Sequence, residues 1–175
     1  VFSVSETGAK NWMEDSLMDL ILTDVKVDEA NSQILFAGSM GTQLGGRDAF
    51  IEARQQNGQI LWSKSFDQYG YKDVALELAI DGNQYILLGS SEAGLNQWEM
   101  ASWYLRADGT PLGYESGSRF TNSIDELSDG HLTANGLIVV GQSAVNSQRD
   151  FKIYAFDFNR SLLWMDSYDR QGLDD

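Results

Sequence analysis

Short apolar runs alternate with turn residues along this chain. In residues 73–80 every second residue is apolar, which predicts a strand with one buried face. The apolar members of that face are Val74, Leu76, Leu78 and Ile80. Asp81-Gly82-Asn83 follows, and Asp-Gly supplies the positive φ that a tight hairpin needs. Residues 84–91 are almost continuously apolar, as is typical of a strand buried on both faces.

This pattern recurs with a period of about 51 residues. Three apolar runs end in Gly38, Gly89 and Gly141, which are 51 and 52 residues apart. Four aromatic residues close the successive units at intervals of 50, 52 and 50: Trp12, Trp62, Tyr114 and Trp164. An aspartate follows each aromatic residue: Asp19, Asp73, Asp125 and Asp175. The chain is therefore an internal repeat.

Each unit is predicted to contain four strands. In the second unit these are residues 73–80, 84–91, 98–106 and 110–115, with a polar loop at 92–97. Residues 13–22 could form about two helical turns, but the repeat predicts a connection and a first strand there. The predicted organisation is the end of a preceding blade (1–13), three blades (14–66, 67–118 and 119–168) and the start of a next blade (169–175).

Two all-β architectures fit four-stranded units of this length. In a β-propeller each unit is one blade of antiparallel strands, and in a β-trefoil three units close a barrel. The fourth copy of the closing element near the N-terminus and the strand that ends in Gly-Ser favour the propeller. Propeller rings have about four to eight blades, so about three blades and a hairpin imply further blades or a second copy.

The repeat resembles bacterial β-propeller repeats of the quinoprotein type and of long secreted proteins. Gly58 to Trp62 and Gly8 to Trp12 match the Gly-x-x-x-Trp ending of the first type. The second type has Asp before the first strand (Asp73, Asp125), Gly-Ser after the second (Gly38-Ser39, Gly89-Ser90) and an Asp-Phe-like start to the third (Asp48-Ala49-Phe50, Asp150-Phe151). Gly113-Tyr114 and Arg160 depart from these patterns, which implies imperfect packing between blades there.

Composition excludes several function classes. The chain has 175 residues, no cysteine and one histidine, so disulfide scaffolds, cysteine nucleophiles and multi-histidine metal sites are excluded. Twelve basic and 26 acidic residues give 12 − 26 = −14, which argues against nucleic acid and anionic membrane surfaces. No apolar run approaches the roughly 20 residues that span a bilayer.

The isolated candidates for chemistry have simpler structural explanations. His131 beside Asp129 resembles a general-base pair, but it also fits an ordinary strand. The recurrent aspartates could hold a cation at a ring centre, although each could instead cap a turn. We expect the tryptophans to pack between blades, and we expect no cofactor and no metal site.

Propeller geometry gathers the loops after the second and fourth strands of each unit at one end, where propellers usually bind ligands. Four basic residues and several aromatic residues fall in or beside these loops, and such surfaces are common interaction hot spots. The predicted binding residues are Gln43, Arg47, Tyr69, Tyr71, Lys72, Asn96, Trp98, Arg119, Phe120 and Arg149.

The sequence thus predicts a non-enzymatic binding or scaffold module built from propeller blades. Its expected partners are a protein or carbohydrate ligand on the loop face, together with a second copy or further blades of the same polypeptide. The alternatives are a fragment of a propeller enzyme, either a quinoprotein-like dehydrogenase or a hydrolase, and a trefoil lectin. The resemblance implies a bacterial protein that is periplasmic or secreted.

Overall fold

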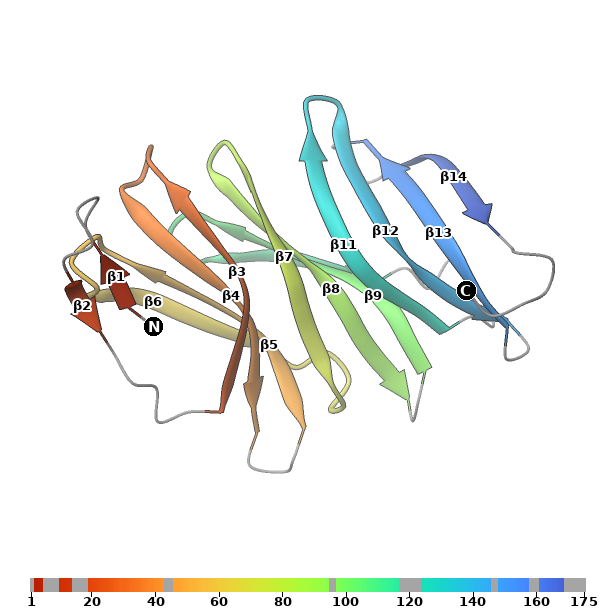
Figure 1. Ribbon diagram of the computed structural model, residues 1–175, viewed down its shortest axis with the longest axis horizontal. Helices are drawn as coiled ribbons and strands as arrows, with labels where there is room; N and C mark the ends of the chain where they lie inside the picture. Colours follow the sequence, from red (N-terminus) through yellow and green to blue (C-terminus); the bar gives the residue numbers. More distant parts are fainter. Residues whose placement is uncertain are drawn as a thin grey trace.

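The computed structural model describes residues 2–4, 10–13, 19–42, 46–94, 97–116, 124–145, 148–157 and 161–168. Within these ranges every regular element is a β-strand (Figure 1). The strands are β1 (Phe2–Val4), β2 (Lys10–Met13), β3 (Leu20–Asp28), β4 (Gln33–Gly41), β5 (Arg47–Arg54), β6 (Ile60–Phe66), β7 (Asp73–Asp81), β8 (Gln84–Gly94), β9 (Gln97–Arg106), β10 (Pro111–Ser116), β11 (Ile124–Thr133), β12 (Gly136–Val145), β13 (Gln148–Phe156) and β14 (Leu162–Tyr168). The protein is therefore an all-β protein in its described part.

Twelve of these strands form three four-stranded antiparallel sheets. The first sheet comprises β3–β6, the second β7–β10 and the third β11–β14, each paired in chain order. Strands β1 and β2 form a separate two-stranded sheet. The three larger sheets follow one another along the molecule, with β3 beside β7 and β7 beside β11 (Figure 1). Among the described strands, no backbone ladder joins one sheet to another.

The first strand of every large sheet carries a β-bulge at the same place in the repeat. The register shifts between Leu22 and Asp24, between Ala75 and Glu77, and between Leu127 and Asp129. The extra residue is Thr23, Leu76 or Ser128. A bulge inserts one residue on one strand only, so it bends that strand and reverses its alternation between faces. The repeat therefore preserves backbone geometry as well as hydrophobic pattern.

The bulge explains the glycine that ends each apolar run. Gly38 pairs with Leu22 and Gly89 pairs with Ala75, directly before the register shift. A Cβ atom at Gly38 would overlap the carbonyl oxygen of Ile21, and one at Gly89 would overlap that of Val74. Gly141 pairs with Leu127 at the corresponding position of the third sheet. The close approach of the bulged strand leaves no room for a side chain at the first two of these positions.

The bulge also corrects one prediction about the second unit. The alternation placed Leu76 on the same face as Leu78 and Ile80. In the structure Leu78 and Ile80 pack in the core toward the first sheet, whereas Leu76 packs in the core toward the third sheet. The bulge at Leu76 shifts the register between Ala75 and Glu77, so strict alternation fails there.

Two hydrophobic layers hold the sheets together. Between the first and second sheets, the buried core includes Ile51 and Ala53 from β5 and Leu78, Leu87 and Trp103 from the second sheet. Between the second and third sheets it includes residues from both partners: Ala79, Ile86, Leu88, Met100, Tyr104, Val139 and Tyr154. The second sheet is therefore covered on both faces, which explains the continuous apolar run of β8.

Strand pairing also corrects the position of one closing aromatic residue. Trp62 pairs with Ala53 and Trp164 with Ala155, but the equivalent pair in the second sheet is Gly113 with Tyr104. Tyr114 pairs with Trp103 and packs against the core on the opposite face. The aromatic ring of this position has therefore moved from the fourth strand to the third strand, where Tyr104 is buried.

The hairpin turn predicted at Asp81-Gly82-Asn83 is confirmed, whereas the predicted polar loop differs in length. Gly58, Gly82 and Gly109 all have positive φ, at 90°, 55° and 82°, as tight turns require. The predicted polar loop at 92–97 is shorter, because β8 extends to Gly94 and β9 begins at Gln97. The predicted first strand near residue 20 is present as β3.

Candidate interaction surfaces

The predicted binding residues lie at the strand ends expected from the topology, as far as the structure describes them. Arg47 begins β5, Tyr69, Tyr71 and Lys72 lie between β6 and β7, and Trp98 lies in β9. Gln43, Asn96, Arg119 and Phe120 lie outside the described residues. The backbone of Arg149 pairs with Ala144 in the β12–β13 ladder, and its side chain lies outside the described part.

Arg47 is engaged within the molecule. Its guanidinium donates to Oδ2 of Asp19 at 2.9 Å and to the backbone oxygen of Asp19 at 3.1 Å. It also donates to Oγ of Ser39 at 3.0 Å and to the backbone oxygen of Ser39 at 3.1 Å. These four bonds tie the start of β5 to β4 and to the residue before β3. Arg47 therefore supports the loop end as a structural residue.

The turn between β6 and β7 presents two tyrosines to solvent. Tyr69 is 42% exposed and Tyr71 is 45% exposed. Gly70 lies between them with φ of 76°, and its N–H donates to Oδ1 of Asp67 at 2.6 Å. The Tyr69 ring also packs edge-on against Tyr114, with ring centroids 6.4 Å apart. These contacts fix the backbone of the turn and the Tyr69 ring, and Tyr71 lies exposed on the same turn.

Asp73 fixes the other end of the same turn. Its carboxylate is buried and accepts the N–H of Gln68 at 2.9 Å and the hydroxyl of Ser91. Burial raises the pKa of Asp73 above the ordinary value of 3.8, against the lowering effect of these hydrogen bonds. The pKa of Asp48 is raised too, by burial and by the charge of Asp67. Asp73 thus caps a turn, as the simpler explanation of the recurrent aspartates predicts.

The recurrent aspartates do not all occupy one position. Asp73 pairs with Ser91 and Asp125 pairs with Ser143, but the equivalent pair in the first sheet is Leu20 with Met40. Asp19 therefore precedes the position of Asp73 by one residue and binds Arg47 instead. Asp175 and the side chain of Asp125 lie outside the described residues. In the described part of the chain, no three acidic or histidine side chains are grouped to hold a metal ion.

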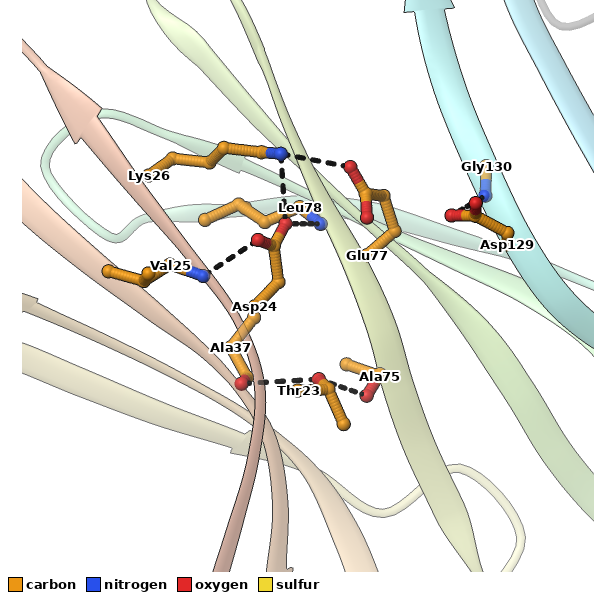
Figure 2. Close-up of polar contacts among 10 residues, drawn as sticks. All are labelled: Thr23, Asp24, Val25, Lys26, Ala37, Ala75, Glu77, Leu78, Asp129 and Gly130. Atoms are coloured by element: carbon orange, nitrogen blue, oxygen red, sulfur yellow. Dashed lines mark hydrogen bonds and ion pairs between the residues drawn. The ribbon is translucent and has the colours of Figure 1, made fainter.

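A polar seam that the sequence analysis missed joins the first strands of the first and second sheets (Figure 2). The hydroxyl of Thr23 donates to the backbone oxygen of Ala75 at 2.9 Å. Oδ2 of Asp24 accepts the N–H of Leu78 at 2.9 Å. Lys26 extends across the gap, with Nζ 3.0 Å from Oε1 of Glu77 and 3.2 Å from Oδ2 of Asp24. The hydrogen bond to Glu77 is the main reason that the pKa of Lys26 is raised.

The seam has a signal in the sequence. The residue after each bulge is acidic: Asp24, Glu77 and Asp129, at intervals of 53 and 52. Asp24 and Asp129 both accept the N–H of the next residue, at 2.7 and 2.8 Å (Figure 2). The carboxylate of Asp129 thus accepts the backbone N–H of Gly130, and the side chain of the neighbouring His131 is exposed in β11. Aligning the units on their bulges, instead of on their aromatic residues, would have revealed this acidic position.

Trp62 confirms the prediction of tryptophan packing between units. Its ring stacks on Tyr85 of the second sheet, with centroids 6.1 Å apart. It also lies against Gly109, where a Cβ atom would approach the indole ring to 2.6 Å. Trp164 differs because it is 48% exposed on the third sheet. The side chain of Trp12 lies outside the described residues.

The chain was compared with known protein families and with curated proteins. No known family matches this chain, and no curated protein is significantly similar to it. Within the described residues, there is also no helix of the length and hydrophobicity needed to cross a membrane.

Proposed function

We propose that this chain is a run of β-propeller blades that acts as a non-enzymatic binding or scaffold module. Three sheets with the same strand order and the same bulge support this architecture. A trefoil would close its strands into one hydrogen-bonded barrel, whereas these sheets meet through side chains and share no ladder in the described part.

One observation carries the binding function. Tyr69 and Tyr71 are both exposed on a turn whose backbone is held by Asp67 and Asp73. Fixed, exposed tyrosines supply contact area at a low entropy cost, because a tyrosine side chain has only two rotatable bonds. A planar ring also stacks on the apolar face of a sugar. The ligand class is accordingly a protein or a carbohydrate, bound at the loop end of the first and second sheets.

The test separates these two ligand classes and includes the enzyme alternative. A glycan array and a peptide array identify a ligand, and calorimetry then compares the wild-type chain with a Tyr69→Ala/Tyr71→Ala double variant. We expect affinity to fall by about 2 kcal/mol or more, the size of a hot-spot loss. Ile60→Ala is the control, since Ile60 is exposed at the opposite end of β6. Unchanged affinity in the double variant, or saturable quinone binding, would contradict the proposal.

A further inference from the structure

The third sheet carries large apolar side chains on the face turned away from the second sheet. Phe151 is 42% exposed, Trp164 is 48% exposed and Tyr168 is 51% exposed. On the other face of the same sheet, Val139 and Tyr154 are buried against the second sheet. Across β13 and β14, Phe151 pairs with Tyr168, and Trp164 pairs with Ala155, a small residue that is buried. They therefore form one continuous face, which we call the open face.

The open face matches a covered face of the first sheet residue by residue. The pairs Ala49–Phe66 and Ala53–Trp62 in the first sheet correspond to Phe151–Tyr168 and Ala155–Trp164, each 102 residues further on. Ala49 and Ala53 are fully buried in the core that joins the first and second sheets. The open face is thus the third copy of a surface whose first copy already has an occupant.

That occupant defines the chemistry of the receiving surface. Trp62 stacks on Tyr85 and lies against Gly109, whose φ of 82° belongs to a left-handed turn. Phe66 stacks on Trp103, with centroids 6.1 Å apart. A surface that receives a tryptophan in this way needs a ring beside it and a turn without a side chain below it. It also needs a second ring for the aromatic residue at the end of the strand.

We propose that the open face docks a further four-stranded unit of this same repeat, following β14 in the polypeptide. That unit receives Trp164 between an aromatic ring and a glycine turn, as Tyr85 and Gly109 receive Trp62. It receives Tyr168 on a second ring, as Trp103 receives Phe66. This inference rests on the proposed propeller architecture and adds the identity of the neighbour.

A second copy of the chain lacks a matching vacant surface in its described part. The face of a sheet that receives the tryptophan is the face turned toward the preceding sheet. In the second and third sheets this face is already covered by the first and second sheets, respectively. In its first sheet, the counterparts of Trp103 and Leu105 are Glu52 and Arg54, 51 residues earlier. These two form an ion pair at 2.5 Å and are already less than a tenth exposed. Tyr168 would meet this ion pair there in place of a ring like Trp103, and the aromatic residues of that face, Phe36 and Phe50, are already buried.

The test supplies the missing neighbour. A chimera keeps residues 1–168 and joins a second copy of residues 67–118 directly after Tyr168, which holds the place of Phe66. Trp164 fluorescence is obtained by difference from the same chimera carrying Trp164→Phe. We expect the Trp164 emission to shift to shorter wavelength, its acrylamide quenching to fall and the thermal midpoint to rise, because apolar surface becomes buried.

A matched control changes only the glycine turn that contacts the tryptophan ring. Gly109→Arg in the appended copy places there the residue type that the third unit carries at Arg160, and we expect it to abolish the shift. A monomeric, cooperatively folded chimera with unchanged Trp164 emission would overturn the proposal. Sedimentation of the unmodified chain gives a second test that does not depend on the chimera, since a dimer that protects Trp164 would also overturn it. Ligand binding by Tyr69 and Tyr71 is a separate measurement, so failure of one proposal does not imply failure of the other.

Discussion

The hydroxyl of Tyr85 donates a 2.6 Å hydrogen bond to Oδ2 of Asp28, and both residues are buried between the first and second sheets. Asp28 also accepts the N–H and the side-chain amide of Asn31, at 3.1 and 2.8 Å, which close the β3–β4 turn. This contact links the turn of one sheet to the second strand of the next. It also satisfies a carboxylate that burial would otherwise destabilise.

The first prediction concerns this hydrogen bond. Tyr85→Phe keeps the ring that stacks on Trp62 but leaves the buried carboxylate of Asp28 without its strongest donor. We expect the free energy of unfolding to fall by about 1.5–3 kcal/mol, as for a buried hydrogen bond to a charged group. Urea denaturation measures the change. Tyr71→Phe is the control, because Tyr71 is exposed; an equal loss in both variants would contradict the assignment.

The second prediction concerns acid. Burial opposes ionisation of Asp28, yet the hydrogen bonds from Tyr85 and Asn31 outweigh it and hold its pKa below the ordinary 3.8. A lowered folded-state pKa gives stability that is present above the unfolded pKa and is lost as pH falls through the folded pKa. The stability difference between wild type and Tyr85→Phe should therefore be largest at neutral pH and shrink in acid. Urea midpoints over an acidic pH series test this, and a constant difference would refute it.

The third prediction concerns Asp73, whose contribution to stability should change with pH in the direction opposite to that of Asp28. Burial raises the pKa of Asp73, so the folded state binds this proton more tightly than the unfolded state. Stability from this group is full below 3.8, its ordinary pKa, and declines as pH rises through the folded-state value. Asp73→Asn should remove that decline and leave stability at neutral pH equal to or above that of wild type. A variant that loses stability uniformly across the same pH range would show that the hydrogen bonds to Gln68 and Ser91 dominate instead.

The fourth prediction uses two glycines of the second sheet. Gly89→Ala places a Cβ atom on the backbone oxygen of Val74, whereas a Cβ atom at Gly113 meets no atom within 4 Å. We expect Gly89→Ala to cost roughly 3 kcal/mol, at the upper end of overpacking effects. Gly113→Ala should stay within about 0.5 kcal/mol, as surface substitutions do. Thermal denaturation of both variants is the measurement, and similar midpoints would show that the bulge adapts.

The fifth prediction concerns the polar seam. Lys26 bridges Asp24 and Glu77, but its side chain is 39% exposed. Lys26→Met should therefore cost only about 0.5 kcal/mol, and the loss should diminish in high salt. A double-mutant cycle with Glu77→Gln isolates the pair. A coupling energy that does not respond to salt would indicate that the aliphatic part of Lys26, and not its charge, supports the seam.

Several parts of the fold could be predicted from the sequence because they depend on local properties. Gly58, Gly82 and Gly109 mark turns, since positive φ is costly for other residues. The 51-residue period and the apolar runs gave the number and order of strands. The bulge at Leu76 was missed, and so was the pairing of Gly113 with Tyr104, which puts the aromatic ring of this position on the third strand instead of the fourth. Both features concern which residues face each other across neighbouring strands.

The candidate surfaces show the same division. The exposed tyrosines on the β6–β7 turn were expected from their place in the repeat. The contact between Arg47 and Asp19 was not expected, because these residues are 28 positions apart and meet only through the β3–β4 and β4–β5 pairings. Sequence distance likewise hid the contact between Lys26 and Glu77, 51 residues apart.

The sequence alone determined that this protein is a repeat of four-stranded units, because turn residues and alternating hydrophobicity act within a few residues of each other. Only the tertiary structure decided which faces are covered. Trp62 and Trp164 occupy the same position in their units, yet one is stacked on Tyr85 and the other is exposed. The difference is the presence of a neighbouring sheet, and burial depends on neighbours that no local pattern encodes.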